Sequence, residues 1–129
     1  MDYLFVGSAH SLQHAADFSM IVNVSIDIPF PKQHTNCLRI PIDDDPADVW
    51  RFSKYMEETR ILDNIHNEVI NKLPVLVHCH AGSQRSCSLV VCYLIKYYGM
   101  TPDAAITHIM SKRPEAFYGG VHLQPWAKN

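Results

Sequence analysis

The chain of 129 residues lacks long apolar runs, clusters of basic residues and closely paired cysteines. A membrane-spanning helix needs about 20 consecutive apolar residues, and no stretch approaches that length. The eleven Lys and Arg are scattered and the net charge is −2, which argues against a nucleic-acid or membrane partner. Met1-Asp2-Tyr3 does not begin a signal peptide, and no Cys-x-x-Cys spacing indicates a zinc ribbon. We expect a soluble protein of a reducing compartment, the cytoplasm and also the nucleus, without bound metal or cofactor.

The length and the order of the apolar segments predict one α/β domain over residues 1–129. Hydrophobic residues make up 47% of the chain and charged residues 19%, a balance typical of a globular domain. Alternating strands and helices favour a sandwich with a central mixed, mostly parallel sheet flanked by helices. The expected strands cover residues 3–6, 20–25, 37–42 and 73–77, and the expected helices cover 11–18, 49–69, 85–98 and 101–113.

Three positions predict where these helices begin and end. Asp48 is a candidate N-cap for one long helix over 49–69, whose apolar residues recur at near-helical spacing on one face. Gly99 is a candidate C-cap for the helix over 85–98, and Thr101 followed by Pro opens the last helix. The helix over 85–98 is apolar on most sides, so we expect it to be buried centrally.

Residues 74–87 read Pro-Val-Leu-Val-His-Cys-His-Ala-Gly-Ser-Gln-Arg-Ser-Cys, a Cys-x5-Arg segment between a strand and a helix. A loop of this length can encircle one phosphate with its backbone N–H groups, and the helix N-terminus adds positive potential. Cys79 then suits a nucleophile, and Arg85 suits a bidentate clamp on two oxygens. The alternative for Cys79 is a buried core cysteine. A zinc site at His78, Cys79 and His80 is disfavoured because consecutive side chains on an extended chain point opposite ways.

The pattern His78-Cys79-x-Ala81-Gly82-x-x-Arg85-Ser86 resembles the active-site motif of cysteine-dependent protein phosphatases. The Ala-Gly and Arg-Ser pairs resemble the dual-specificity branch in particular. Segments 3–8, 21–25 and 113–116 also resemble the family, in the same order along the chain. The resemblance implies a phosphotyrosine-phosphatase-like sandwich and a minimal dual-specificity phosphatase catalytic domain over residues 1–129.

The resemblance also implies a role for each residue of the motif. Cys79 attacks phosphorus, Arg85 grips the phosphate, Ser86 donates to the sulfur, and His78 orders the loop and helps to hold the thiolate. The phosphate-binding loop is then made of His80, Ala81, Gly82, Ser83, Gln84 and Arg85. The family commonly has Ser or Gly before the arginine, so Gln84 is a departure that affects loop shape and pocket depth.

The leaving oxygen needs a proton, so a general acid on a separate loop is required. The resemblance implies an Asp from the loop after the strand over 37–42, where the chain offers Asp43, Asp44, Asp45 and Asp48. Asp44 lies in Asp44-x-Pro46, which resembles the Asp-x-Pro of some members, and is the first candidate. Asp45 is the second, and Asp48 suits the N-cap better.

The function implied by the resemblance is hydrolysis of phosphotyrosine and phosphoserine/threonine in proteins, through a phosphocysteine intermediate. Two alternatives stay open: a phosphatase of RNA 5′-phosphate or phosphoinositide, and a non-catalytic phosphate-binding module. Residues 80–84 carry no fixed positive charge, which disfavours the first, and intact Cys79 and Arg85 disfavour the second. We expect a monomer with phosphorylated proteins as partners. Cys37 or Cys87 is a candidate to trap an oxidised Cys79 as a disulfide.

Overall fold

Four short strands lie side by side in the order β1-β4-β2-β3, and each neighbouring pair is parallel. The computed structural model describes residues 2–34 and 36–127. The elements in chain order are β1 (Leu4–Gly7), the 3₁₀ helix η1 (Ala9–Asp17), β2 (Met20–Asn23), β3 (Cys37–Arg39), the 3₁₀ helix η2 (Pro46–Asp48), α1 (Val49–Thr59), α2 (Ile61–Ile70), β4 (Val75–His78), α3 (Arg85–Tyr98) and α4 (Pro102–Lys112). The expected α/β sheet flanked by helices is confirmed, and the described strands pair in parallel throughout.

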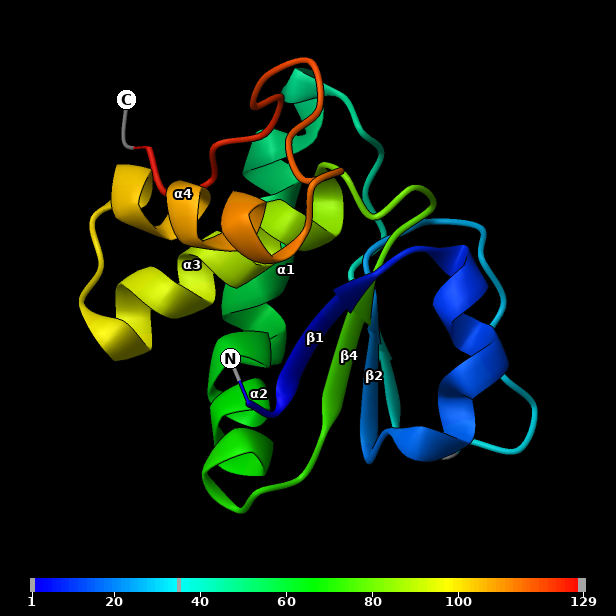
Figure 1. The fold of residues 1–129 in the computed structure, drawn as a ribbon. Helices are drawn as coiled ribbons and strands as arrows, with labels where there is room; N and C mark the ends of the chain where they lie inside the picture. Colours follow the sequence, from blue (N-terminus) through cyan, green and yellow to red (C-terminus); the bar gives the residue numbers. More distant parts are fainter. Residues whose placement is uncertain (1, 35, 128–129) are drawn as a thin grey trace.

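The helices cover the two faces of the sheet unequally (Figure 1). The α-helices lie on one face and η1 lies on the other. Successive side chains of β2 therefore alternate between two apolar clusters, as expected for a strand buried on both faces. Met20 and Val22 join the large cluster under the α-helices, whereas Ile21 packs with Ala15 and Leu76 beneath η1.

The strand ends bring the loops that follow them to one edge of the sheet. His78 at the end of β4 lies opposite Gly7 of β1 and Asn23 of β2, and Asn23 lies opposite Arg39 of β3. Because the strands are parallel, their carboxyl ends share this edge, which is where α/β proteins commonly bind ligands. The loop after β4 sits at the centre of the edge, between the loops after β1 and β2.

The prediction of one long helix over 49–69 is wrong, because the chain breaks at Arg60. Arg60 adopts a left-handed conformation with φ 52° and ψ 39°, ending α1 before α2 begins. Met56 and Ile65 are both buried, and because they are nine positions apart, a straight helix of about 3.6 residues per turn would place them on opposite sides. The break lets each segment turn its own apolar face toward the core.

The helix ends follow the sequence at two of the three predicted positions. Gly99 is left-handed with φ 64° after α3, and the Thr101 hydroxyl accepts the Ala104 N–H at the start of α4. Asp48 does precede α1, but its side chain makes no capping bond and instead accepts the backbone N–H of Asp43 at 2.8 Å. The predicted capping role of Asp48 is therefore wrong, because its carboxylate closes the preceding turn.

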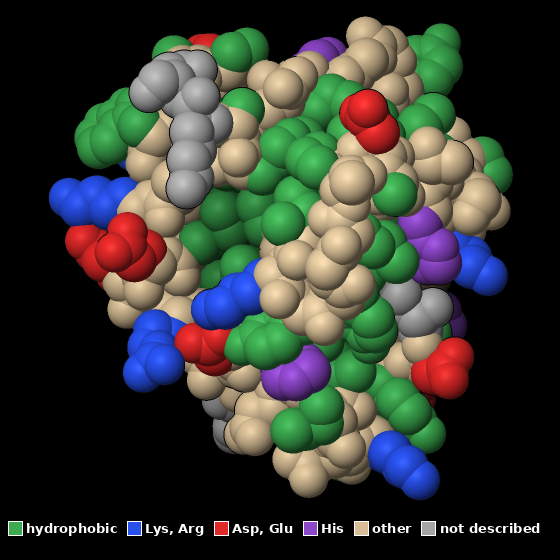
Figure 2. Space-filling view, turned by 90° about the vertical axis from the view of Figure 1, so that its left-hand side faces the viewer, with side chains coloured by type: hydrophobic (Ala, Val, Ile, Leu, Met, Phe, Trp, Pro, Cys, Tyr) green, Lys and Arg blue, Asp and Glu red, His purple; other side chains and the backbone are tan. Residues whose placement is uncertain are grey.

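A hollow of about 520 Å³ lies between α1, α2 and α3. Figure 2 shows its hydrophobic floor, bordered by side chains of both charges. It is lined by Ser53, Met56, Glu57, Arg60, Leu62, Asp63, Cys92, Lys96 and Pro125. None of these residues belongs to the loop after β4, so the hollow is separate from the Cys-x5-Arg segment.

Among the described residues, no helix combines the length and the apolarity needed to cross a membrane.

Candidate active site

The loop after β4 ends at the N-terminus of α3, the most deeply buried helix. Gln84 occupies the N-cap position without capping the helix through its side chain. The first helical bond there joins the Ser88 N–H to the Gln84 carbonyl at 2.8 Å. The N–H groups of the first turn are left to an anion, which the helix N-terminus favours electrostatically. Residues 80–85, the predicted phosphate-binding loop, therefore lead into a helix N-terminus that can accept an anion.

Gly82 is required at its place in the loop for two reasons. Its φ of 68° is left-handed, and a Cβ there would lie 2.6 Å from the Gly7 carbonyl oxygen and 2.5 Å from Arg113 Nη2. Arg113 uses that close approach: its Nε donates to the Gly82 carbonyl at 2.7 Å and its Nη2 to the Ala81 carbonyl at 3.2 Å. The guanidinium thus turns two loop carbonyls outward, so that the loop N–H groups are free to face the other way.

Cys79 and Ser86 meet at the base of the loop. The Cys79 Sγ lies 3.2 Å from the Ser86 Oγ, and Cys79 is only 2% exposed. The hydroxyl can donate to the sulfur, which stabilises a thiolate both as nucleophile and as leaving group. Cys87 behaves differently: its thiol donates to the Gly82 carbonyl at 3.4 Å, and burial raises its pKa to about 12. Cys79 is therefore the motif cysteine that is placed for chemistry.

Arg85 links the loop to the segment that carries the candidate acids. Its Nη1 donates to the Ile42 carbonyl at 3.0 Å, and the side chain is largely buried. This bond brings the turn over 43–48 beside the phosphate-binding loop, although the two are far apart in sequence. Arg85 thus contacts the residue that leads into the acidic turn.

Three of the four candidate carboxylates, those of Asp44, Asp45 and Asp48, have different partners, and these differences separate them. The Asp45 side chain accepts the Ala47 N–H at 2.9 Å and caps η2, while Asp48 accepts the Asp43 N–H. Within residues 2–34 and 36–127, the Asp44 side chain makes neither kind of backbone bond; its Oδ1 lies 3.3 Å from His122 Nδ1. The structure therefore favours Asp44 over Asp45 as the carboxyl available for a reaction, because Asp45 is used as a cap.

His78 is fully buried at the end of β4. Its Nδ1 lies 3.4 Å from the Cys79 carbonyl, and in the described part of the chain its Nε2 has no hydrogen-bond partner. Burial lowers its pKa below the ordinary value, so the ring is neutral near pH 7. His78 therefore contacts the backbone at Cys79 and supplies no positive charge to the sulfur, while its role in ordering the loop and holding the thiolate stays a prediction.

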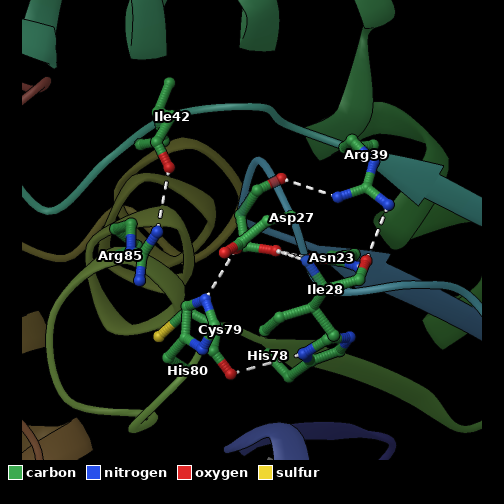
Figure 3. A network of polar contacts seen from close by, with 10 residues as sticks. Asn23, Asp27, Ile28, Arg39, Ile42, His78, Cys79, His80 and Arg85 are labelled. Carbon is green, nitrogen blue, oxygen red and sulfur yellow. Dashed lines mark hydrogen bonds and ion pairs between the residues drawn. The ribbon is translucent and has the colours of Figure 1, made fainter.

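A loop after β2 borders the phosphate-binding loop (Figure 3). Arg39 holds it by donating to the Ser25 carbonyl at 3.0 Å and the Ile28 carbonyl at 2.7 Å. The loop presents Asp27, whose Oδ1 lies 2.8 Å from His80 Nε2. The hydrogen bond from His80 lowers the pKa of Asp27, and the nearby Arg85 charge acts in the same direction. A carboxylate thus stands beside the motif, where the sequence alone placed none.

Sequence reasoning missed several residues that shape this site. Arg113 belongs to a segment that resembled the family, and that was its only signal. Asp27, Arg39 and His122 gave none, because their partners are distant in the sequence. The metal reading of His78, Cys79 and His80 gains no support: the described residues contain no group of three His, Cys, Asp or Glu placed to hold an ion. Cys37 packs beneath η1, on the other face of the sheet from Cys79. Cys87 lies in the same apolar cluster as Cys79.

A buried thiol, a hydroxyl beneath it and an arginine at the start of the next helix define a site of the cysteine-phosphatase class. Comparison with known proteins agrees. The family described as "Dual specificity phosphatase, catalytic domain" matches residues 3–124. The chain belongs to the dual-specificity phosphatase family.

Relatives and solved structures resemble the chain over different lengths. Dual specificity protein phosphatase 18 of Mus musculus is 33% identical over 95 residues, covering 73% of this chain and 48% of the relative. Dual specificity protein phosphatase 1 of Arabidopsis thaliana is 55% identical over 42 residues, covering 33% of this chain and 21% of the relative. The chain thus spans about half or less of these curated relatives. The crystal structure of human DUSP28 aligns with a TM-score of 0.78 and 29% identity, covering 90% of this chain and 82% of that one.

Proposed function

We propose that this chain is a minimal catalytic domain that hydrolyses phosphotyrosine and phosphoserine/threonine in proteins through a phosphocysteine intermediate. The observation that carries the proposal is the Cys79 Sγ at 3.2 Å from the Ser86 Oγ, at the foot of an anion-binding loop. The chemistry needs no metal, because the thiolate supplies the nucleophile and Arg85 with the loop N–H groups supplies the positive charge. Membership of the family supports the same activity.

The first step transfers the phosphoryl group to sulfur. The Cys79 thiolate attacks phosphorus in line, so an S–P bond forms as the P–O bond to the leaving group breaks. Arg85 and the loop N–H groups bind the three equatorial oxygens throughout. Asp44 gives its proton to the leaving oxygen and becomes a carboxylate.

The second step releases phosphate. Water attacks phosphorus and gives a proton to the Asp44 carboxylate, while the S–P bond breaks. The electron pair returns to the Cys79 sulfur, and the Ser86 hydroxyl, 3.2 Å away, stabilises the departing thiolate. The cycle returns both residues to their starting states.

The surroundings of the loop favour a peptide phosphate over a polyanion. Asp27 beside His80 and the carboxylates of the 43–48 turn place negative charge around the mouth, and residues 80–84 add no fixed positive charge. Further phosphates on a lipid headgroup or an RNA 5′ end would be repelled there. One relative is named a phosphatidylglycerophosphate phosphatase, PTPMT1 of Arabidopsis thaliana, but its 42% identity covers only 50 residues and 15% of that protein.

We propose the cytoplasm as the compartment, because a catalytic thiol must stay reduced. A monomeric state stays a prediction.

A panel of substrates tests the proposal. The protein is assayed on an aryl phosphate, then on phosphotyrosine, phosphoserine and phosphothreonine peptides, an RNA 5′-phosphate and a phosphoinositide at equal concentration. We expect turnover of the aryl phosphate and of both classes of phosphopeptide. Faster turnover of the RNA 5′-phosphate or the phosphoinositide would identify a phosphatase of RNA or lipid. Binding without any turnover would identify a non-catalytic phosphate-binding module.

A further inference from the structure

Gln84 ties the phosphate-binding loop to the segment after α4. Its Nε2 donates to the Gly120 carbonyl at 2.7 Å and the Tyr118 carbonyl at 3.2 Å, and its Oε1 accepts the His122 backbone N–H at 3.0 Å. Gln84 is 4% exposed, so these bonds are made in a buried setting. A Ser or Gly at this position has no side chain long enough to make them. The departure from the usual family residue therefore has a structural consequence.

The segment around His122 is held at a second point as well. The next residue, Leu123, is fully buried, and its carbonyl accepts the Ser88 hydroxyl at 2.8 Å. The His122 backbone is therefore fixed on both sides, by Gln84 from the loop and by Ser88 from α3. A side chain that projects from such a segment has a defined direction.

The imidazole of His122 points at the proposed general acid. Its Nδ1 lies 3.3 Å from Asp44 Oδ1, and both side chains are partly exposed, at 43% and 38%. An exposed pair of this kind adds little to folding stability. Folding stability therefore does not explain why the His122 backbone is anchored at two points so that its side chain reaches Asp44.

We propose that His122 is a positioning residue for Asp44, and that Gln84 holds it in place. The inference rests on the proposed function, since it requires Asp44 to act as the acid. With Oδ1 engaged by His122, Oδ2 is the oxygen left to protonate the leaving group and later to accept the proton from water. His122 keeps its own proton count through the cycle and forms no bond to substrate. Its effect is on the fraction of time that Asp44 spends in a productive orientation.

The test compares substitutions that keep or lose the Nδ1 position. In His122→Asn the side-chain amide occupies the place of Nδ1, in His122→Gln it occupies that of Nε2, and His122→Ala has neither. We expect His122→Ala to lower kcat on an alkyl or peptide phosphate about tenfold with little change in KM, and to leave an activated aryl phosphate within about twofold. Asn should recover most of the loss and Gln should not. The control is His14→Ala, which removes an exposed histidine 4.0 Å from Asp17 on η1.

A second arm tests whether Gln84 acts through His122. Gln84→Ser loosens the loop as well as His122, so it should slow every substrate and, in addition, lower the ratio of alkyl to aryl turnover as His122→Ala does. Because both changes break one chain of contacts, the double variant should lower that ratio no further than about the larger single effect. Additive effects would mean that Gln84 acts by another route and would overturn its part of the proposal.

The outcomes separate this inference from the function beneath it. If Asp44→Asn lowers the alkyl-to-aryl ratio while His122→Ala leaves it unchanged or raises it, the positioning role is wrong and the acid assignment stands. If Asp44→Asn leaves the ratio unchanged, the acid assignment is wrong and the role of His122 falls with it. If the unmodified protein turns over no aryl phosphate, the acid assignment of Asp44, the positioning role of His122 and the proposed function are all wrong.

Discussion

The phosphate-binding loop and the acidic turn over 43–48 face each other across the site but are held very differently. The loop is tied by Arg113 and Gln84, and the Phe117 N–H donates to its Ser83 carbonyl at 2.7 Å. The turn is mostly exposed, and its side-chain bonds are largely internal, from Asp45 and Asp48 to its own backbone. In the described part of the chain, side chains link it to the rest of the site through the contact between Asp44 and His122, and Arg85 binds the carbonyl of Ile42 just before it.

This difference matches two different demands of the chemistry. Binding a phosphate through preorganised N–H groups requires donors that do not reorganise during the reaction. Delivering a proton and then accepting one requires a group that can approach and retreat as the leaving group departs. The comparison predicts that damage to the loop affects every substrate, whereas damage to the turn depends on the leaving group.

The largest effect is expected from the loop nucleophile. Cys79→Ser should lower kcat by more than about a thousandfold on all substrates, because a serine hydroxyl at this site lacks a base to ionise it. Binding of phosphate or sulfate should persist, since the N–H groups and Arg85 remain. Stopped assays with isothermal titration of sulfate measure both. Activity within tenfold of the unchanged protein would remove Cys79 from its assigned role.

A smaller and more selective effect is expected from the turn. Asp44→Asn should slow an alkyl or peptide phosphate by about a hundredfold or more, and an activated aryl phosphate much less. Asp45→Asn is the matched control one residue away: it weakens a cap of η2 and should cost at most about 1 kcal/mol of stability, with turnover retained. If Asp45→Asn shows the leaving-group dependence instead, the acid is Asp45.

Loosening the loop should have an intermediate, unselective effect. Arg113→Lys cannot reproduce the two bonds to the Gly82 and Ala81 carbonyls, so the loop N–H groups should be less well aligned. We expect kcat to fall about tenfold on aryl and alkyl phosphates alike. Arg60→Lys, at an exposed arginine paired with Asp63, should leave kcat unchanged. A loss confined to the alkyl phosphate would contradict the division between loop and turn.

The smallest expected effect is on the pH dependence of stability, through His78. Because burial lowers its pKa from the ordinary 6.5, the unfolded chain binds the proton more readily. The contribution of neutral His78 to the free energy of unfolding is then fully present above about pH 6.5. It decreases as the pH falls from there through the pKa of His78 in the folded protein. Urea unfolding between pH 7.5 and 5 should show a steeper loss in the unchanged protein than in His78→Asn. Equal slopes would contradict the buried neutral state.

The sequence predicted what is local and missed what is long-range. The loop and the limits of α3 followed from residues 74–98, where strand, motif and apolar helix adjoin one another. Gln84 was identified as unusual, but its partners could not be, since His122 lies 38 residues away. The pair of Asp27 and His80 spans 53 residues and the contact of Asp44 with His122 spans 78. Such contacts depend on how parallel strands collect their loops at one edge, and no sequence spacing encodes them.

The break at Arg60 is an instructive miss. Apolar residues continue at helical intervals on both sides of it, so the pattern alone predicts one helix. The buried faces of α1 and α2 are offset by half a helical turn. This offset, between Met56 and Ile65, could be read from the sequence. Tracking the phase of the apolar face, and not only its period, would have predicted the break.

The central claim is that Cys79 carries the phosphoryl group between the two steps. Rapid acid quenching of the protein with an activated aryl phosphate, followed by peptide mass spectrometry, tests it directly. The account predicts one phosphoryl group on the Cys79 peptide during turnover, with more of it in Asp44→Asn, where activation of water is slowed. No phosphoryl adduct in either protein during active turnover, or an adduct on a different residue, would contradict the account.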